Sequence, residues 1–422
     1  MIRSGVLALA LFAGLSLANA EDSPLFKLQG FATISAYGIA TTTGGGGDAP
    51  VMRVRTPEEF FAAAERTDIK SKAARNTTPR VIEIVNDLDL GELANERAGN
   101  ELKSVGIVHV RPNTTIFSRG DGATLRHGTL EIHGSQNVIL RNLKFRELWE
   151  FDPTGKYDRF GWDYIRITNA GKERSHHIWI DHCDFGRAYD GAVDITHGSD
   201  LVTVSWCRFG GDHNGPHKKV MLIGHSSGPG AASTDTGKLN VTLHNNYFHD
   251  IDDRAPRVRF GNVHVFNDMV DGAENATISV MNAVTLVENC IYRDAAVATT
   301  FSHANDTVKK NRAGTITIVN SRNENPRTPK ADVEIEESEE GGAKDVPHAQ
   351  KDPNRDFELA HNFQSSIERS ALRFNAPAGW KWENPNALPY NYQLDPTDAV
   401  TALVEKFSGT GKLRDDELIP AR

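Results

Sequence analysis

The chain has 422 residues, 24% of them charged and 39% hydrophobic, with a formal net charge of −9 at pH 7. An acidic chain repels a polyanion on average, so a polyanionic partner would need a local basic site, a bound cation or both. The chain has three cysteines, Cys183, Cys207 and Cys290, which are too few for a disulfide scaffold at this length.

The first 20 residues predict a secretory signal peptide. Arg3 precedes an apolar run from Val6 to Leu17, and Ala18-Asn19-Ala20 has the small-residue pattern of a cleavage site. The apolar run is too short to span a bilayer. We therefore expect a secreted, extracellular protein that has no membrane segment after cleavage at Ala20 and forms a single domain over residues 21–422.

The segment 56–66 predicts a helix near the start of the mature chain. Thr56 and Glu59 have the spacing of a capping box, and Pro57 suits a first helical turn. We expect this helix to cap one end of the domain.

The middle of the sequence repeats one pattern. The copies begin at residues 178, 202, 241, 263 and 285, and each has alternating apolar residues, a polar break and a final apolar residue. The repeating unit is therefore roughly 22 residues long, with insertions. Such a unit has the composition of a strand and a turn, and it cannot bury its apolar face alone.

Stacking of these units predicts an all-β, right-handed parallel β-helix with helical end caps and lateral loops. A β-sandwich is the alternative, but the repeats lack the Asn-Gly turns of short hairpins. One position of the repeat should form a column up the stack, namely Cys183, Cys207, Asn246, Asp268 and Cys290. We expect free, buried thiols in this column, with a Cys183–Cys207 disulfide as the alternative.

Two segments near the carboxyl end carry further signals. Residues 330–345 are strongly acidic and predict a solvated loop. Residues 395–409 begin with Asp395 and Pro396, have apolar residues at helical spacing and end at Gly409. This amphipathic helix is expected to cover an open end of the stack.

Three aspartates are candidates for a metal site. Asp190 and Asp194 are four residues apart, and Asp163 belongs to the preceding coil, so their carboxylates can converge on one lateral face. Calcium prefers such hard oxygen ligands. For any one of them alone, a turn-capping aspartate is the simpler interpretation.

The stretch DDRAPRVRFG concentrates positive charge in a short loop. Pro256 stiffens the backbone and would hold Arg254 and Arg259 at fixed attitudes, which suits bidentate recognition of carboxylates. We expect Arg257 to face the other way. Three carboxylates nearby would oppose a nucleic acid, and no interleaved aromatic residues support base stacking.

Five ordered motifs carry a resemblance to a known family: GWDYIRI, WIDH, DGAVDITHGSDLVTVSWCRF, HKKVMLIG and DRAPRVRFGNVHVFN. Together with TTTGGGGDAPVMRVRTPEEF they resemble the secreted pectate lyases of polysaccharide lyase family 1, the Arg-x-Pro-x-x-Arg type. The similarity extends from roughly residue 29 to residue 325. A lone Arg-x-Pro-x-x-Arg would be a weak signal, whereas five motifs in order are specific.

The resemblance implies a right-handed parallel β-helix, a Ca²⁺ cofactor and β-elimination of α-1,4-linked polygalacturonate to 4,5-unsaturated oligogalacturonides. The residues implied for calcium are Asp163, Asp190 and Asp194; Arg254 is implied as the base, and Lys219 and Arg259 as substrate-binding residues. Calcium and the neighbouring cations would disfavour the charged form of Arg254, so we expect an alkaline optimum. Where some relatives carry a further aspartate this chain has Gly161, so three carboxylates alone, or Asp158 in addition, would complete the site.

Other functions stay open at this point. A pectin lyase would act on methyl-esterified substrate and have little use for an acidic metal cluster, and a glycoside hydrolase needs an acid–base pair. A non-catalytic polysaccharide-binding β-helix would keep the basic face without turnover. The pair His213 and His217 suggests zinc, but Gly215 and Pro216 exclude a regular helical site. Loops 146–162 and 210–217 are expected to set substrate preference, and a capped solenoid is expected to be a monomer.

Overall fold

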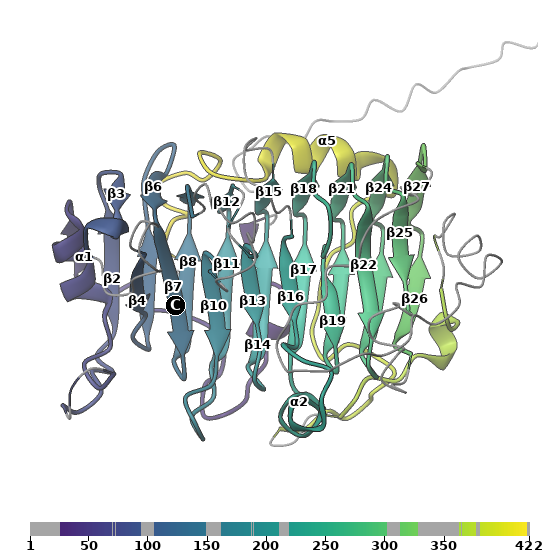
Figure 1. The fold of residues 1–422 in the computed structure, drawn as a ribbon, viewed down its shortest axis with the longest axis horizontal. Helices are drawn as coiled ribbons and strands as arrows, with labels where there is room; N and C mark the ends of the chain where they lie inside the picture. The colour runs from purple at the N-terminus through teal and green to yellow at the C-terminus, as the bar shows by residue number, and fades with distance from the viewer. Residues whose placement is uncertain are drawn as a thin grey trace, which may run out of the picture.

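The computed structural model describes residues 26–69, 71, 73–93, 105–148, 162–186, 188, 190–210, 219–301, 313–327, 363, 365–376 and 380–419. These residues form a solenoid of three parallel sheets that run along its length (Figure 1). The predicted right-handed parallel β-helix is confirmed. Among the described residues, no helix combines the length and the apolar character that crossing a membrane requires.

The first sheet has ten strands: β1 (Val51–Val54), β2 (Arg80–Ile84), β5 (Thr114–Phe117), β8 (Gln136–Arg141), β11 (His176–Asp181), β14 (Asp200–Ser205), β17 (Asn240–His244), β20 (Asn262–Phe266), β23 (Val284–Glu288) and β26 (Thr315–Val319). The second sheet has eight: β4 (Gly106–His109), β7 (Gly128–His133), β10 (Ile165–Thr168), β13 (Val193–Ile195), β16 (Met221–Ile223), β19 (Arg257–Arg259), β22 (Asn275–Val280) and β25 (Val297–Thr300). The third sheet has nine: β3 (Leu88–Asp89), β6 (Ala123–Arg126), β9 (Leu143–Arg146), β12 (Asp184–Phe185), β15 (Arg208–Gly210), β18 (Tyr247–His249), β21 (Met269–Asp271), β24 (Ile291–Arg293) and β27 (Arg322–Glu324).

Each coil passes from the first sheet to the third and then to the second, and the repeats align as the sequence predicts. Ile178 pairs with Val202, Val202 with Val241, and Val241 with Val263. The corner between the first and third sheets is a single residue with positive φ, which is asparagine in most coils, as at Asn245 (φ 55°). Asparagine tolerates this left-handed conformation better than most residues, so it can turn the chain within one position.

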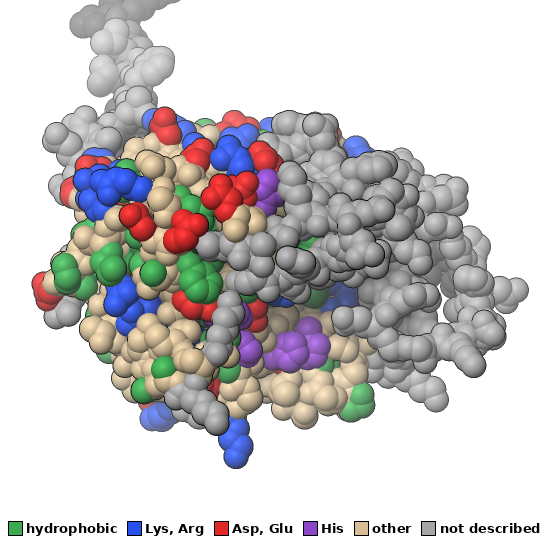
Figure 2. Space-filling view, turned by 60° about the vertical axis from the view of Figure 1, so that its left-hand side comes forward, with side chains coloured by type: hydrophobic (Ala, Val, Ile, Leu, Met, Phe, Trp, Pro, Cys, Tyr) green, Lys and Arg blue, Asp and Glu red, His purple; other side chains and the backbone are tan. Residues whose placement is uncertain are grey.

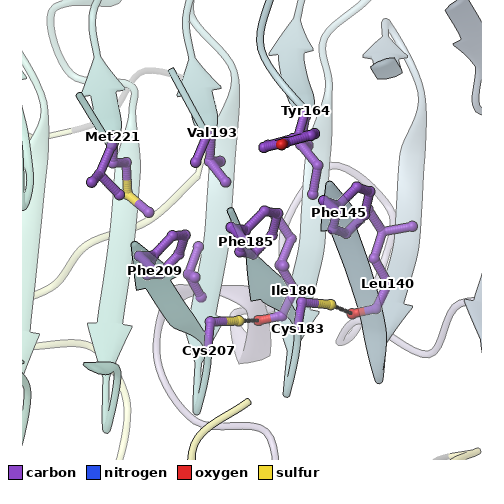
Figure 3. Packing of buried hydrophobic residues seen from close by; sticks show 14 of the residues in the cluster. Leu140, Phe145, Tyr164, Ile180, Cys183, Phe185, Val193, Cys207, Phe209 and Met221 are labelled. Atoms are coloured by element: carbon purple, nitrogen blue, oxygen red, sulfur yellow. Dashed lines mark hydrogen bonds between the residues drawn. The ribbon is translucent and has the colours of Figure 1, made fainter. Parts of the chain in front are cut away.

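The core is built from columns of like residues. The rings of Phe145, Phe185, Phe209 and Phe248 stack with centroids 4.8 Å apart at each step, which is the spacing of neighbouring strands. Figure 3 shows three of these rings facing side chains of the second sheet, such as Val193. Each coil therefore packs on the next through the same contact.

A polar column runs beside the phenylalanines, and all three cysteines in it are free and buried, so the disulfide alternative is wrong. The thiol of Cys183 donates to the Leu140 carbonyl at 3.7 Å, and that of Cys207 donates to the Ile180 carbonyl at 3.8 Å (Figure 3). Asp268 in the same column accepts from the Asn246 backbone N–H at 2.7 Å. Burial raises the pKa of Asp268 well above its ordinary value and so favours the neutral form of this carboxyl, against the opposing effect of the hydrogen bonds from Asn246.

Helix α1 (Pro57–Ala64) closes the amino-terminal end of the stack, as predicted (Figure 1). Thr56 accepts a hydrogen bond from the Glu59 N–H at 3.2 Å, and Phe60, Ala63 and Ala64 are buried in the core. Helix α2 (Pro229–Asp235) belongs to the insertion between β16 and β17. Three short 3₁₀ helices complete the described helical elements: η3 (Phe31–Thr33), η4 (Leu90–Leu93) and η5 (Arg369–Ala371).

Helix α5 (Thr397–Phe407) does not cover an open end, so that prediction is wrong. It lies along the outside of the third sheet, above β18, β21 and β24 (Figure 1). Val400 and Val404 pack against Tyr247, Met269 and Ile291, which are the first residues of those three strands. These strands present apolar side chains on the outside of the solenoid, and α5 shields them from water.

The segments around α5 form a strap along the solenoid, which we call the C-terminal strap and define as the described residues 363, 365–376 and 380–419. At one end the Ser366 N–H donates to the Ile316 carbonyl of β26 at 2.8 Å. Nearer the amino-terminal end of the solenoid, the Gly409 N–H donates to the Trp206 carbonyl and the Gly411 N–H to Asn142 Oδ1, each at 2.8 Å. Leu418 is buried against Val81 and Phe117, near the other end of the first sheet.

Candidate functional site

The residues singled out in the sequence lie on, or just before, four consecutive strands of the second sheet. Asp163 precedes β10, Asp190 precedes β13 and Asp194 is within it; Lys219 precedes β16, Arg254 precedes β19 and Arg259 ends it. These strands are neighbours in the order β19-β16-β13-β10. The stack therefore places acidic residues on two coils and basic residues on the next two.

Gly191 brings the acidic residues together. Its N–H donates to Asp163 Oδ1 at 2.8 Å, and the Asp190 N–H donates to the Trp162 carbonyl at 3.1 Å, so the loop before β13 rests on the preceding coil. A Cβ at Gly191 would lie 2.9 Å from Asp163 Oδ1, 3.3 Å from Asp194 Oδ1 and 3.6 Å from the Val220 carbonyl. Three oxygen atoms thus converge on a point that a side chain would fill.

The electrostatics of this cluster fit a cation. Burial, followed by the charges of Asp194 and Asp190, raises the pKa of Asp163 well above its ordinary value. Burial and then Asp190 raise the pKa of Asp194 to about 7, against the opposing effect of Arg254 and Arg166. Asp194 Oδ1 is buried and has no hydrogen-bond partner among the described residues. A hard divalent cation such as calcium would supply the partner that these oxygens lack.

The basic residues lie against the next coils. Lys219 forms a parallel bridge with Asp253, and the Met221 N–H donates to the Arg254 carbonyl at 2.8 Å. Arg254 Nε is 3.8 Å from Asp253 Oδ2. Arg259 donates from Nη1 to the Gly224 carbonyl at 3.0 Å, which holds its guanidinium beside β16.

The predicted orientation of Arg257 is wrong. Arg257 and Arg259 lie two residues apart in β19 and therefore on the same side, with Val258 pointing into the core between them. Arg257 aligns with Leu222, which aligns with Asp194, so it stands in the same outward column as the cluster.

Comparison with known proteins decides the family. The family model described as pectate lyase matches residues 4–413. Pectate lyase B of Paenibacillus amylolyticus is 32% identical over 329 residues, which are 63% of this chain and 80% of the relative. The chain belongs to the pectate lyase family.

Other pectate lyases agree with this result. Pectate lyase E of Dickeya chrysanthemi is 34% identical over 251 residues, which cover 55% of this chain and 60% of the relative. The solved pectate lyase of Paenibacillus sp. 0602 superposes with a TM-score of 0.65 at 24% identity, covering 94% of this chain and 99% of that one. The pectate lyase of Bacillus sp. N165, solved in complex with trigalacturonate, gives a TM-score of 0.61 at 20% identity, with coverage of 92% and 100%. The expectation of a pectate lyase enzyme with a β-helix fold is confirmed.

Several expectations about this pectate lyase fall on residues outside the described ones. They concern Asp158, Gly161, His213, His217, the acidic run 330–345 and most of the loops 146–162 and 210–217. Within the described part, acidic and basic side chains are interspersed on the face shown in Figure 2.

Two residues near the site were missed in the sequence. Arg166, in β10, stands in the column between Glu131 and Asp194, and it donates to Glu131 Oε2 at 3.0 Å. Its outward direction follows from the buried neighbours Ile165 and Ile167, but its partner is far away in the sequence. Asp253 directly precedes Arg254, and this adjacency in the sequence was the available signal. Its Oδ1 is buried without a hydrogen-bond partner among the described residues.

Proposed function

We propose that this pectate lyase depends on calcium and cleaves α-1,4-linked polygalacturonate by β-elimination, releasing 4,5-unsaturated oligogalacturonides. The observation that carries the proposal is the buried carboxylate cluster around Gly191, with its unpartnered Asp194 Oδ1, next to two coils of fixed cations. A polygalacturonate chain is a polyanion, so this acidic protein would bind it through a bound cation and local basic residues. The related pectate lyase solved with trigalacturonate supports this choice of substrate.

Asp163, Asp190 and Asp194 would hold the calcium. When bound, calcium would neutralise the C6 carboxylate of a galacturonate and make its C5 proton more acidic. Gly191 would keep the carboxylate oxygens of Asp163 and Asp194 accessible, because any larger residue would occupy the space between them.

The basic residues would orient the substrate and take the proton. Lys219 and Arg259 would bind uronate carboxylates, with Arg259 held in place by its bond to Gly224. Arg254 would accept the C5 proton, and Asp253 beside it would fix the direction of its guanidinium. The C5–H electron pair then forms the C4–C5 double bond, and the C4–O pair leaves with the departing sugar oxygen, which takes a proton from water.

Arg254 accepts a proton only in its neutral form, so activity should rise toward alkaline pH. The variant Arg254→Lys tests the assignment because it keeps a cation but changes both geometry and basicity. We expect a large loss of turnover with calcium binding retained. Full activity with an unchanged pH profile would exclude Arg254 as the base.

We also propose that residues 1–20 are a signal peptide, that the protein is secreted and that residues 21–422 act as one monomeric domain. The apolar run from Val6 to Leu17 supports the first two statements. The C-terminal strap supports a single domain because it contacts coils from both halves of the solenoid.

The direct test mixes purified protein with polygalacturonate, with calcium or with a chelator, at several alkaline pH values. The unsaturated product absorbs in the ultraviolet, so a calcium-dependent rise in absorbance supports eliminative cleavage. Reducing ends without absorbance would show hydrolysis instead, and binding without cleavage would favour a polysaccharide-binding protein. Activity only on methyl-esterified substrate without calcium would point to a pectin lyase.

A further inference from the structure

A second group of ligand-type side chains lies on the outer face of the second sheet, toward its amino-terminal end. His109 ends β4, and Glu131 and His133 are the outward residues at the end of β7. His109 and Glu131 are direct register partners. One ligand atom from each of the three residues lies within 4.8 Å of the others.

Glu65 fixes the orientation of His109. Glu65 Oε2 accepts from the His109 backbone N–H at 2.8 Å, and Oε1 is 3.1 Å from His109 Nδ1. Because Glu65 accepts at Nδ1, the lone pair of the neutral ring is on Nε2, which is 3.9 Å from Glu131 Oε2. A carboxylate behind a histidine is the arrangement that orients metal-binding imidazoles.

The spacing between the ligand atoms suits a shared metal better than direct hydrogen bonds. His133 Nδ1 is 3.5 Å from Glu131 Oε1, and His109 Nε2 is 3.9 Å from the other oxygen of the same carboxylate, Oε2. Both exceed the usual hydrogen-bond range. In a tetrahedral site with bonds of about 2.1 Å, neighbouring ligand atoms lie about 3.4 Å apart, which is close to the separation of His133 Nδ1 from Glu131 Oε1. The ligand atoms of all three residues lie within 4.8 Å of one another, so a small side-chain adjustment would bring His109 into the same set.

The surroundings favour a site of modest affinity that is open to solvent. The side chains of His109, Glu131 and His133 are 15%, 14% and 32% exposed, so an ion can enter without unfolding. Arg166 donates to Glu131 Oε2 at 3.0 Å, and Arg66 donates to the His133 carbonyl. These two cations oppose a metal ion and leave Glu131 Oε1 as the freer oxygen.

We propose that His109, Glu131 and His133 form a transition-metal site of the zinc class, separate from the three aspartates, with Glu65 as the group that positions His109. Two imidazole nitrogens and one carboxylate oxygen suit zinc and other borderline ions, whereas calcium prefers all-oxygen sites. Three protein ligands leave a fourth position for water.

The test is calorimetric titration of Zn²⁺ into the purified protein in excess calcium, which saturates oxygen-donor sites. We expect one zinc ion per chain, with affinity reduced at least about tenfold in both His133→Ala and His109→Ala, because each removes one of three ligands. The matched control is His225→Ala, a partly exposed histidine whose ring stacks on His197 at 3.8 Å, and it should bind zinc like the parent. Circular dichroism melting verifies that each variant is folded.

Two outcomes would overturn the proposal. Zinc affinity unchanged in His133→Ala would show that the ion binds elsewhere, and loss in His225→Ala would move the site to the other histidine pair. Titration with Co²⁺ gives a second readout, because four-coordinate cobalt with nitrogen ligands absorbs visible light far more strongly than the hydrated ion. Those bands should be present in the parent and lost in His133→Gln, and their persistence in this variant would refute the assignment.

Discussion

The variant Asp194→Asn tests whether the carboxylate cluster is built for a cation, and it does so without an activity assay. The substitution keeps the shape of the side chain and removes its charge. Burial and the charge of Asp190 raise the pKa of Asp194 from 3.8 to about 7 in the folded, metal-free protein. Because the pKa of Asp194 is higher in the folded than in the unfolded protein, the parent has its full stability below about pH 4 and loses stability as the pH rises through 7. At about 1.36 kcal/mol per pKa unit, the loss is on the order of 4 kcal/mol.

Chemical denaturation of parent and variant in a chelator, at pH 4 and at pH 8, measures the stability that the parent loses when Asp194 ionises. The variant lacks the ionisation, so its free energy of unfolding relative to the parent should increase between the two values by up to the same amount. Calcium at a hundred times its dissociation constant should then stabilise the parent by about 2.7 kcal/mol and the variant far less. Asp121→Asn, at an exposed aspartate, is the control for loss of a charge.

A relative stability that does not change with pH would refute the electrostatic reasoning about Asp194. Equal stabilisation of parent and variant by calcium would show that the cluster is not where the ion binds.

Three further predictions concern other parts of the molecule. Gly191→Ala should weaken calcium binding at least about tenfold in calorimetry, because its Cβ would lie 2.9 Å from an Asp163 oxygen. Gly230→Ala is the control, since a Cβ there meets no atom within 4 Å and calcium affinity should not change. Equal affinities of the two variants would show that calcium does not bind beside Gly191. Asp268→Asn should change the free energy of unfolding by less than about 1 kcal/mol, because burial raises the pKa of this carboxyl and favours its neutral form, while Asp268→Ala should cost about 1–3 kcal/mol in urea denaturation; a costly asparagine would mean that the native group is charged. Val404→Ala should cost about 1–3 kcal/mol with unchanged turnover, since α5 packs on the third sheet and away from the site; unchanged stability would mean that this contact contributes little.

The repeated pattern was sufficient to predict the coils, because a stacked unit must put equivalent residues in one column. The column from Cys183 to Cys290 and the meeting of Asp163 with Asp194 follow directly from that rule. Helix α1 was also predictable, since Thr56 and Glu59 mark its start locally.

Features that depend on distant partners were not predictable. The apolar stripe of α5 shows that Val400 and Val404 are buried, but it does not say against which surface. Arg257 was misplaced because the alternation of a strand depends on where the strand begins, and one residue reverses every side chain. Arg166 looked like an ordinary strand residue, because its partner Glu131 belongs to the previous coil.

The C-terminal strap changes how the whole solenoid is expected to unfold. In a solenoid whose coils touch only their neighbours, terminal coils can peel away one at a time. Here Asp395 alone accepts hydrogen bonds from the side chains of Asn245 and Asn267, on adjacent coils, at 3.0 Å each. The strap thus links adjacent coils to one another along the axis of the solenoid. Peeling should be suppressed, so the described coils should melt together in one sharp transition.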